Sequence, residues 1–341
     1  MALALRLSDP GLSYSTTADD PRLGDRVRLG PALGGVALLG YADDRAVVNG
    51  GGRAGAASGP AEARRFLYGL TPGDRGELER LALFDLGDAV LPTADDEDDP
   101  SDFDDDTAPI QERVPKDLPD TPPLPSIEEL HASIEEAALG ALRGGSCVVL
   151  LGGGHDGAYG SHSALLRASS GRVGAVNVDA QLDVRPLREG KITNGTPFRR
   201  LAERWGSRYH LVELGIQPQH NARAHLAFCD ERGFPVVTLA EAREGGILDA
   251  FTRALRQDGE ALAVSLDLHS VHAACAPGVS APCPDGLAAS DLLACARLAG
   301  RDARVRVLDV MELSPPHDLD GRTARLAAAA VWSFLAGIAE R

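Results

Sequence analysis

The segment CVVLLGGGHD, residues 147–156, decides the fold class of this chain. An apolar run that ends in glycines and then in polar residues is typical of a strand buried on both faces of a parallel sheet. Helical stretches separate most of the later segments that repeat this pattern. The sequence therefore predicts an α/β fold with a mostly parallel central sheet covered on both faces. The repeats are VGAVNVDAQLD (173–183), YHLVELGIQ (209–217), FPVVTLA (234–240), ALAVSLDLH (261–269) and RVRVLDVMELSP (304–315).

The region before these runs adds a strand and helices. A buried strand is predicted at GVALLGY (35–41), which leads into the glycine-rich loop and helical pattern of NGGGRAGAASGPAEARRFL (49–67). The glycine spacing matches neither a dinucleotide nor a P-loop fingerprint, so we expect this loop to border a substrate pocket. Ser126 and Glu129 have the spacing of a capping box and predict a helix of about four turns.

Length and composition indicate one globular enzyme domain over residues 1–341. With 341 residues, 44% of them hydrophobic, the chain is long enough for a large α/β core. Residues 92–125 are acidic and rich in proline, which predicts a flexible insertion. Nine acidic residues between Asp95 and Asp106 make up more than half of the formal net charge of −16. The net charge therefore says little about the active site.

Several classes of protein are disfavoured by composition. An acidic chain does not suit nucleic-acid binding, which needs a basic surface. The five cysteines form no CxxC pair and the apolar stretch at the N-terminus is too short for a signal peptide, so we expect a reducing cytoplasm. No window approaches 18 uninterrupted apolar residues, and we expect no membrane span.

Polar side chains follow the predicted strands, at the points where the strands end. Because parallel strands place their carboxyl ends at one edge of a sheet, these side chains should gather there. Packed carboxylates need a compensating cation, which predicts a site for one or two divalent metals. Taken singly, an aspartate at a strand end could equally be a helix cap or turn former. The residues are His155, Asp156, Asp179, Gln181, Asp183, Asp267, His269 and Glu312.

The spacing of these residues suggests how they face the site. Asp179, Gln181 and Asp183 alternate along the chain, and on an extended strand they would share one face. The same holds for Asp267 and His269. Mixed carboxylate and imidazole ligands suit Mn(II) or another borderline metal better than the thiolates of structural zinc sites.

These motifs resemble the arginase, agmatinase and formimidoylglutamase family of ureohydrolases over most of the chain. Within the family, GGGHD, TNGTPFRRL (193–201) and APGVSAP (276–282) are most similar to formimidoylglutamase. The resemblance implies a three-layer α/β/α fold, a site for two manganese ions, and hydrolysis of a carbon–nitrogen bond by a metal-activated hydroxide. The motifs are NGGGRAGAASGPAEAR, GGGHDGAYGS, NVDAQLD, SLDLHSVHAACAPGVSAPCPDGL and VLDVMELSPPHDLDGRTARLAA.

Carried over by position, the resemblance assigns the first metal an intact set of ligands: His155, Asp179, Asp183 and Asp267. The second metal would share Asp179 and Asp267, but the family's histidine and last aspartate are here Gln181 and His269. An amide oxygen is a weak ligand for a transition ion. We therefore expect one Mn(II) to bind and the second to bind weakly or not at all. The alternative is that His269 restores a second position with altered metal preference.

The resemblance also assigns roles around the metal. Asp183 and Glu312 are the candidate catalytic residues, and Glu312 could pair with a guanidinium or formiminium group. Asn194 stands where relatives carry a histidine associated with proton transfer; asparagine cannot transfer protons, but it can orient a substrate. A substrate carboxylate could be received by an arginine, with three candidates: Arg185, Arg199 and Arg223.

Two functions remain open on this reading. The first is a metal-dependent hydrolase of a linear amidine, acting on a formimino or guanidino amino acid and releasing formamide or urea. The second is a non-catalytic protein that keeps the fold as a binding or regulatory module, because Gln181, His269 and Asn194 all depart from the family pattern. In either case the resemblance implies a small amino-acid-derived ligand and a homo-oligomer.

Overall fold

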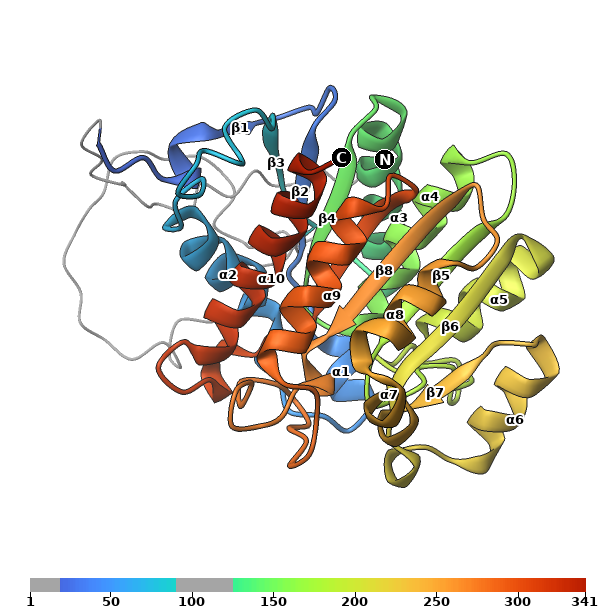
Figure 1. Ribbon diagram of the computed structural model, residues 1–341. Coiled ribbons are helices and arrows are strands. Elements are labelled where there is room, and N and C mark those ends of the chain that lie inside the picture. The colour runs from blue at the N-terminus through green and yellow to red at the C-terminus, as the bar shows by residue number, and fades with distance from the viewer. Residues whose placement is uncertain (1–18, 90–124) are drawn as a thin grey trace, which may run out of the picture.

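The computed structural model describes residues 19–89 and 125–341 of the chain. In this part, nine strands form one sheet in the order β1-β3-β2-β4-β9-β8-β5-β6-β7, and every neighbouring pair is parallel (Figure 1). The predicted parallel sheet is confirmed. The strands are β1 (Val27–Leu29), β2 (Val36–Tyr41), β3 (Leu83–Ala89), β4 (Cys147–Gly152), β5 (Val173–Val178), β6 (Tyr209–Ile216), β7 (Val236–Thr238), β8 (Ala261–Asp267) and β9 (Val305–Met311).

Helices cover both faces of the sheet and give three layers. Successive strand residues point to opposite faces, so Leu38 joins one buried cluster and Leu39 the other. The first cluster packs α2 (Gly59–Tyr68), α7 (Leu239–Gly245), α8 (Ile247–Leu255), α9 (Ala289–Arg301) and α10 (Arg322–Ala339). The second packs α3 (Ile127–Arg143), α4 (Ala158–Ala168), α5 (Pro197–Trp205) and α6 (Arg223–Arg232). None of the described helices has the length and apolarity needed to cross a membrane.

Two strands, β1 and β3, were not predicted. β3 did not have the pattern of a buried strand because it carries Asp85 and Asp88. Both carboxylates are buried against Arg64 of α2, whose Nε lies 2.7 Å from Asp85 Oδ2 and whose Nη1 bonds Asp88. The charges are therefore paired inside the fold rather than exposed. The predicted insertion at 92–125 lies outside the described residues except for Pro125.

The capping box at the start of α3 is confirmed. Ser126 Oγ accepts the backbone N–H of Glu129 at 3.2 Å, and the Glu129 carboxylate accepts the backbone N–H of Ser126 at 2.6 Å. The helix runs for 17 residues, slightly longer than predicted. It lies beside α4, which begins directly after the turn that follows β4.

Candidate metal centre

A glycine turn places His155 at the carboxyl edge of the sheet. After β4, the backbone N–H groups of Gly153 and Gly154 donate to the carbonyls of Tyr41 and Asp43, at 2.8 and 3.0 Å. A Cβ on Gly153 would lie only 2.1 Å from the Asp43 carbonyl oxygen, so no other residue fits this approach. The turn ends in a short 3-10 helix, His155–Gly157, in which the His155 side chain is fully buried.

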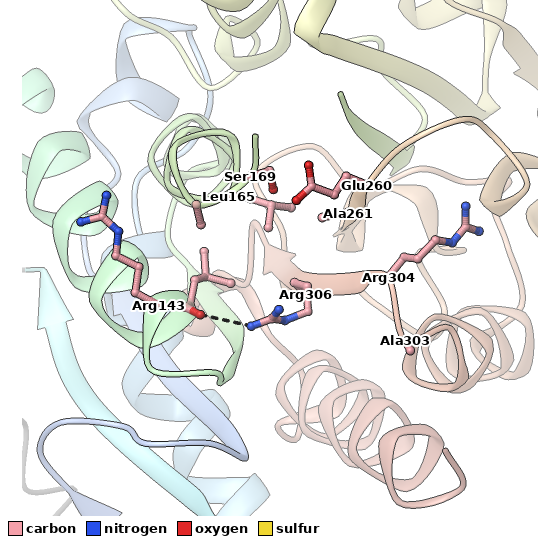
Figure 2. Close-up of a pocket in the computed structure, with 10 residues that line it drawn as sticks. Arg143, Leu165, Ser169, Glu260, Ala261, Ala303, Arg304 and Arg306 are labelled. Carbon is pink, nitrogen blue, oxygen red and sulfur yellow. Dashed lines mark hydrogen bonds between the residues drawn. The ribbon is translucent and has the colours of Figure 1, made fainter. Parts of the chain in front are cut away.

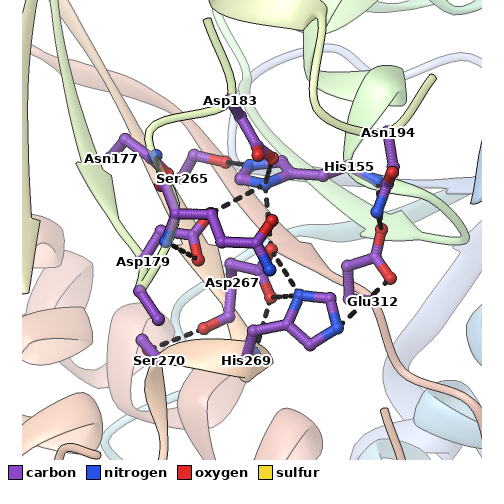
Figure 3. Close-up of polar contacts among 12 residues, drawn as sticks. His155, Asn177, Asp179, Asp183, Asn194, Ser265, Asp267, His269, Ser270 and Glu312 are labelled. Carbon is purple, nitrogen blue, oxygen red and sulfur yellow. Dashed lines mark hydrogen bonds and ion pairs between the residues drawn. The ribbon is translucent and has the colours of Figure 1, made fainter. Parts of the chain in front are cut away.

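Three carboxylates surround the Nδ1 atom of His155 (Figure 3). Asp183 Oδ2 and Asp267 Oδ2 each lie 3.0 Å from it, and Asp179 Oδ2 lies 3.4 Å away. One ligand atom from each of the four residues falls within 4.8 Å of all the others. The four residues predicted to hold the first metal are therefore brought together, from the ends of β4, β5 and β8 and the loop after β5.

The route by which Asp183 reaches the cluster differs from the prediction. β5 ends at Val178, so residues 179–183 are not an extended strand and their alternation does not place them on one face. Instead the chain turns, and Asp183 adopts φ +48°, a left-handed conformation that is uncommon for a residue other than glycine. Backbone strain of this kind is held where the surrounding structure over-determines it, often at functional sites.

The donor atoms fit a bound cation. His155 Nδ1 and Asp179 Oδ2 are buried, and neither has a hydrogen-bond partner among the described residues. The other ring nitrogen, Nε2, lies 2.8 Å from the hydroxyl of Ser265, which fixes the ring with Nδ1 toward the carboxylates. The ring also packs edge-on against Phe198, with centroids 5.2 Å apart. One imidazole with three carboxylates is a ligand set that suits Mn(II).

The charges in the cluster shift its protonation. Burial opposes a charged imidazole, but the carboxylates of Asp179, Asp183 and Asp267 raise the pKa of His155 well above its ordinary value. Burial and then the two neighbouring carboxylates raise the pKa of Asp179 to about 8. Burial also raises the pKa of Asp267, but the neighbouring His269 and His155 outweigh it and hold this pKa below the usual range. Without a cation, the cluster keeps protons to limit its negative charge.

The side-chain amide oxygen of Gln181 is held by an arginine. Its Oε1 accepts a hydrogen bond from Arg185 Nη2 at 2.9 Å, and its backbone N–H donates to Asp179 Oδ1 at 3.0 Å. The amide oxygen that would have to bind a second metal is therefore engaged by a cationic side chain. The side-chain amide of Gln181 is also neutral, so it adds no negative charge to attract an ion.

Both ring nitrogens of His269 are engaged by protein groups. Nδ1 lies 3.2 Å from the Asp267 carboxylate, and Nε2 lies 3.1 Å from both Ser280 Oγ and the backbone nitrogen of Ala281. Burial opposes a charge, but Asp267 and Glu312 raise the pKa of His269 to about 10. An imidazolium has no free lone pair, and a neutral ring would use its lone pair on the N–H of Ala281. In neither protonation state does His269 offer a nitrogen to a metal as it stands.

Glu312 is held at the site by several donors. Its Oε1 accepts the backbone N–H of His155 at 2.9 Å and the side-chain amide of Asn194 at 3.0 Å, while its Oε2 accepts the Ser280 hydroxyl at 3.0 Å. His269 Nε2 lies 3.6 Å from the same Oε2. Glu312 is fully buried at φ +69°, and burial raises its pKa. This side chain therefore links the turn of the first metal ligand to His269.

The three arginines proposed for a substrate carboxylate differ in position. Arg185 contacts the site through Gln181, whereas Arg199 bonds Glu203 and lies over the ring of Phe228. Arg223 is exposed at the start of α6. Of these three arginines, Arg185 is the one that hydrogen-bonds a residue of the predicted site.

The glycine-rich loop after α1 (Arg45–Asn49) contacts segments of the site, and its expected place beside a substrate pocket stays a prediction. A Cβ on Gly50 would lie 2.7 Å from Asn194 Oδ1. Arg53 donates to the carbonyls of Val279 and Ser280, at 2.7 and 3.2 Å, and so joins this loop to the segment that carries Ser280. The loop therefore touches two of the segments that hold Glu312.

A cavity of about 280 Å³ lies at the opposite edge of the sheet (Figure 2). It is lined by the carboxyl ends of α3 and α4 and by the first residues of β8 and β9. Arg306 donates to the carbonyls of Leu142 and Ser146, and Arg304 to that of Leu255, so these arginines cap helix ends. The residues that line this cavity pack against one another at this edge of the sheet. They include no cluster of carboxylates around an imidazole like the one at His155.

Comparison with known proteins identifies the family. Residues 35–337 match the Arginase family. The chain belongs to the arginase family. Two arginase-family relatives named formimidoylglutamase are similar to it: one from Aromatoleum aromaticum, 33% identical and covering 90% of this chain and 84% of its own, and one from Halobacterium salinarum, 32% identical and covering 88% and 87%.

Solved structures of the arginase family share the fold. A Trypanosoma cruzi formiminoglutamase with Mn²⁺ has a TM-score of 0.79 at 30% identity, over 95% of this chain and 100% of that one. A proclavaminate amidino hydrolase from Streptomyces clavuligerus has a TM-score of 0.71 at 25% identity, over 97% and 99%. The expected arginase-like α/β fold is confirmed.

Sequence reasoning missed several residues that support this arginase-family site. Ser265 and Ser280 contact site histidines, yet a serine in a strand or loop gives no distinctive signal. His131 lies in α3 and Arg200 in α5, and the two side chains contact each other. The spacing of apolar residues in a helix predicts only surface or packing roles for such side chains. The signal that could have found Ser265 is the alternation in SLDLH, in which Ser265 stands two residues before the ligand Asp267.

Proposed function

We propose that this arginase-family protein is a metal-dependent hydrolase of a linear amidine. A formimino or guanidino amino acid and water would give the free amino acid and formamide or urea. The observation that carries the proposal is the buried cluster at His155, in which two potential metal-ligand atoms have no hydrogen-bond partner in the described part of the chain. The relatives named above carry the name of an enzyme, and none favours a non-catalytic protein.

The residues of the cluster would hold one Mn(II). His155, Asp179, Asp183 and Asp267 would supply the ligands, and Ser265 holds the other ring nitrogen of His155, so that Nδ1 faces the carboxylates. A bound divalent ion lowers the pKa of water toward neutrality and so makes a nucleophile available at ordinary pH. Asp183, the least buried of the four ligands, would take a proton in the reaction.

Glu312 and Asn194 would recognise the amidine. A carboxylate fixed by the His155 N–H and by Asn194 Nδ2 presents oxygens to a cationic amidine in one orientation. Charge-assisted hydrogen bonds of this kind are shorter and stronger than neutral ones. Asn194 therefore acts by orienting Glu312 and the substrate, and not by transferring a proton.

Activity tests this function directly. Purified protein loaded with Mn(II) is expected to release formamide or urea from at least one member of a panel of formimino and guanidino amino acids. Asp183→Asn is the matched control, because it keeps the size of the side chain and removes a charged ligand; we expect its turnover to fall at least about a hundredfold. A wild-type protein that turns over no member of the panel contradicts the proposal.

We further propose that each chain binds one metal ion and not two. Gln181 is engaged by Arg185, and both nitrogens of His269 are engaged by Asp267, Ser280 and Ala281. The double variant Gln181→His with His269→Asp restores the family's ligand types. Elemental analysis after loading with Mn(II) is expected to give about one ion per chain for the wild type and about two for the double variant. Unchanged stoichiometry in the double variant would show that these residues do not set the count.

Cellular location and assembly stay predictions. All five cysteines lie in the described part of the chain and all are free, which suits the cytoplasmic location that we propose. We also propose a homo-oligomer and a role in the breakdown of histidine-derived amino acids, as the family resemblance implies. Sedimentation of the purified protein measures its assembly state.

A further inference from the structure

Asp156, the residue after the metal ligand His155, is the centre of a second buried network. Its Oδ2 accepts a hydrogen bond from the Tyr41 hydroxyl at 2.6 Å and lies 2.8 Å from His131 Nε2. Tyr41 ends β2, and His131 lies in α3. All three side chains are buried, with no more than 1% of each residue exposed. None of these groups belongs to the metal cluster itself.

An arginine completes this network from α5. Arg200 Nη1 lies 3.0 Å from His131 Nδ1, and its guanidinium lies over the ring of Tyr159 at 3.8 Å from the centroid. A guanidinium can only donate, so these contacts assign the ring proton of His131 to Nε2, where it is donated to Asp156. The imidazole thus connects the positive charge of Arg200 to the negative charge of Asp156.

The network adds side-chain contacts to a turn whose backbone N–H groups at Gly153, Gly154 and His155 are already hydrogen-bonded. The three glycines before His155 constrain the backbone least of all residues, so contacts with other elements have to hold the turn. His155 and Asp156 are neighbours in the same 3-10 helix. Contacts that fix the side chain of Asp156 also fix the backbone of this short helix. They therefore limit the positions that the ring of His155 can take.

We propose that Tyr41, His131 and Arg200 are positioning residues that hold Asp156 and, through it, set the place of His155 Nδ1 in the metal centre. This inference rests on the metal site proposed above. Groups behind a ligand that fix its orientation typically change metal affinity about 10- to 100-fold when they are removed. The network would act on the affinity of the site without touching the ion.

Two variants of His131 separate a specific bridge from simple packing. His131→Leu removes the donor and the acceptor, and we expect the dissociation constant for Mn(II) to rise about 10- to 100-fold. His131→Gln keeps one donor for Asp156 and one acceptor for Arg200, and is expected to restore most of the affinity. Free Mn(II) is measured by electron paramagnetic resonance during titration of the protein, and thermal melting of each metal-free variant reports stability.

Two tyrosine variants supply a matched control. Tyr41→Phe removes a buried hydroxyl that donates to Asp156. Tyr68→Phe removes a buried hydroxyl of α2 that donates to Asp85 of β3, outside the network around Asp156. We expect Tyr41→Phe to weaken Mn(II) binding several-fold and Tyr68→Phe to leave it unchanged, although both lower the melting temperature. This comparison decides the matter if His131→Leu does not fold.

The outcomes are distinct. Wild-type affinity in a folded His131→Leu protein, or equal affinities in the two tyrosine variants, would overturn the positioning role. Equal weakening by His131→Leu and His131→Gln would overturn the bridge to Arg200. A wild-type protein that binds no Mn(II) at all would overturn the metal site on which the inference rests, and this result is separate from the others.

Discussion

Protons and a metal ion compete for the same atoms around His155. In the metal-free protein the three carboxylates raise the pKa of His155 against the effect of burial, and burial with the neighbouring charges raises the pKa of Asp179 to about 8. Below these pKa values the two groups carry protons that an incoming ion must displace. Above them the ligands are free. Metal affinity should therefore increase with pH.

We expect the dissociation constant for Mn(II) to fall as pH rises from about 6 to about 8, by up to tenfold per pH unit for each proton displaced. Titrations followed by electron paramagnetic resonance at several pH values measure this slope. Calorimetry in two buffers of different ionisation enthalpy counts the protons released. An affinity that does not change over this range would contradict the assigned ligands.

At the scale of elements, α3 supplies a matched pair of stability changes. Ser126→Ala removes the side-chain acceptor for the Glu129 N–H and is expected to cost about 1 kcal/mol. Gly140 is exposed near the other end of the same helix, and a Cβ there would meet no atom within 4 Å. Gly140→Ala should therefore stabilise the protein by roughly 0.5–1 kcal/mol, because alanine loses less backbone freedom in a helix.

Urea denaturation of the two variants and of the wild type measures both effects. The two substitutions are expected to change the free energy of unfolding in opposite directions, although both affect α3. A general sensitivity of this helix to substitution would lower the stability in both cases. A Ser126→Ala variant as stable as the wild type would show that the capping box does not stabilise the start of α3. Destabilisation by Gly140→Ala would contradict the open surroundings of this position.

For the whole molecule, the metal site couples binding to folding. Its ligands come from the ends of β4, β5 and β8 and from the following loop, which approach each other only in the folded chain. An ion that binds only the folded state stabilises it by about 2.7 kcal/mol when its concentration is 100 times the dissociation constant. We expect Mn(II) to raise the melting temperature by a few degrees, and Asp183→Asn to abolish most of this rise.

Differential scanning calorimetry with and without Mn(II) measures the shift. The wild type treated with a chelator should melt at the metal-free temperature. A rise of equal size in Asp183→Asn would place the stabilising ion somewhere other than the cluster.

The sequence by itself determined the parallel sheet and the gathering of polar side chains at one edge of it, because buried parallel strands are continuous apolar runs and their carboxyl ends share an edge. The resemblance to the arginase family singled out four of those residues as metal ligands: His155, Asp179, Asp183 and Asp267. β3 could not be recognised, since its charges are neutralised by Arg64, which comes from an earlier segment of the chain.

Only the tertiary structure decided what surrounds the metal ligands. The left-handed turn at Asp183, the engagement of Gln181 and His269 by protein groups, and the bridge from Arg200 through His131 to Asp156 are set by contacts between elements. A sequence pattern records which faces are buried. It does not record which side chain on a neighbouring element meets a given atom, because that depends on how the layers pack.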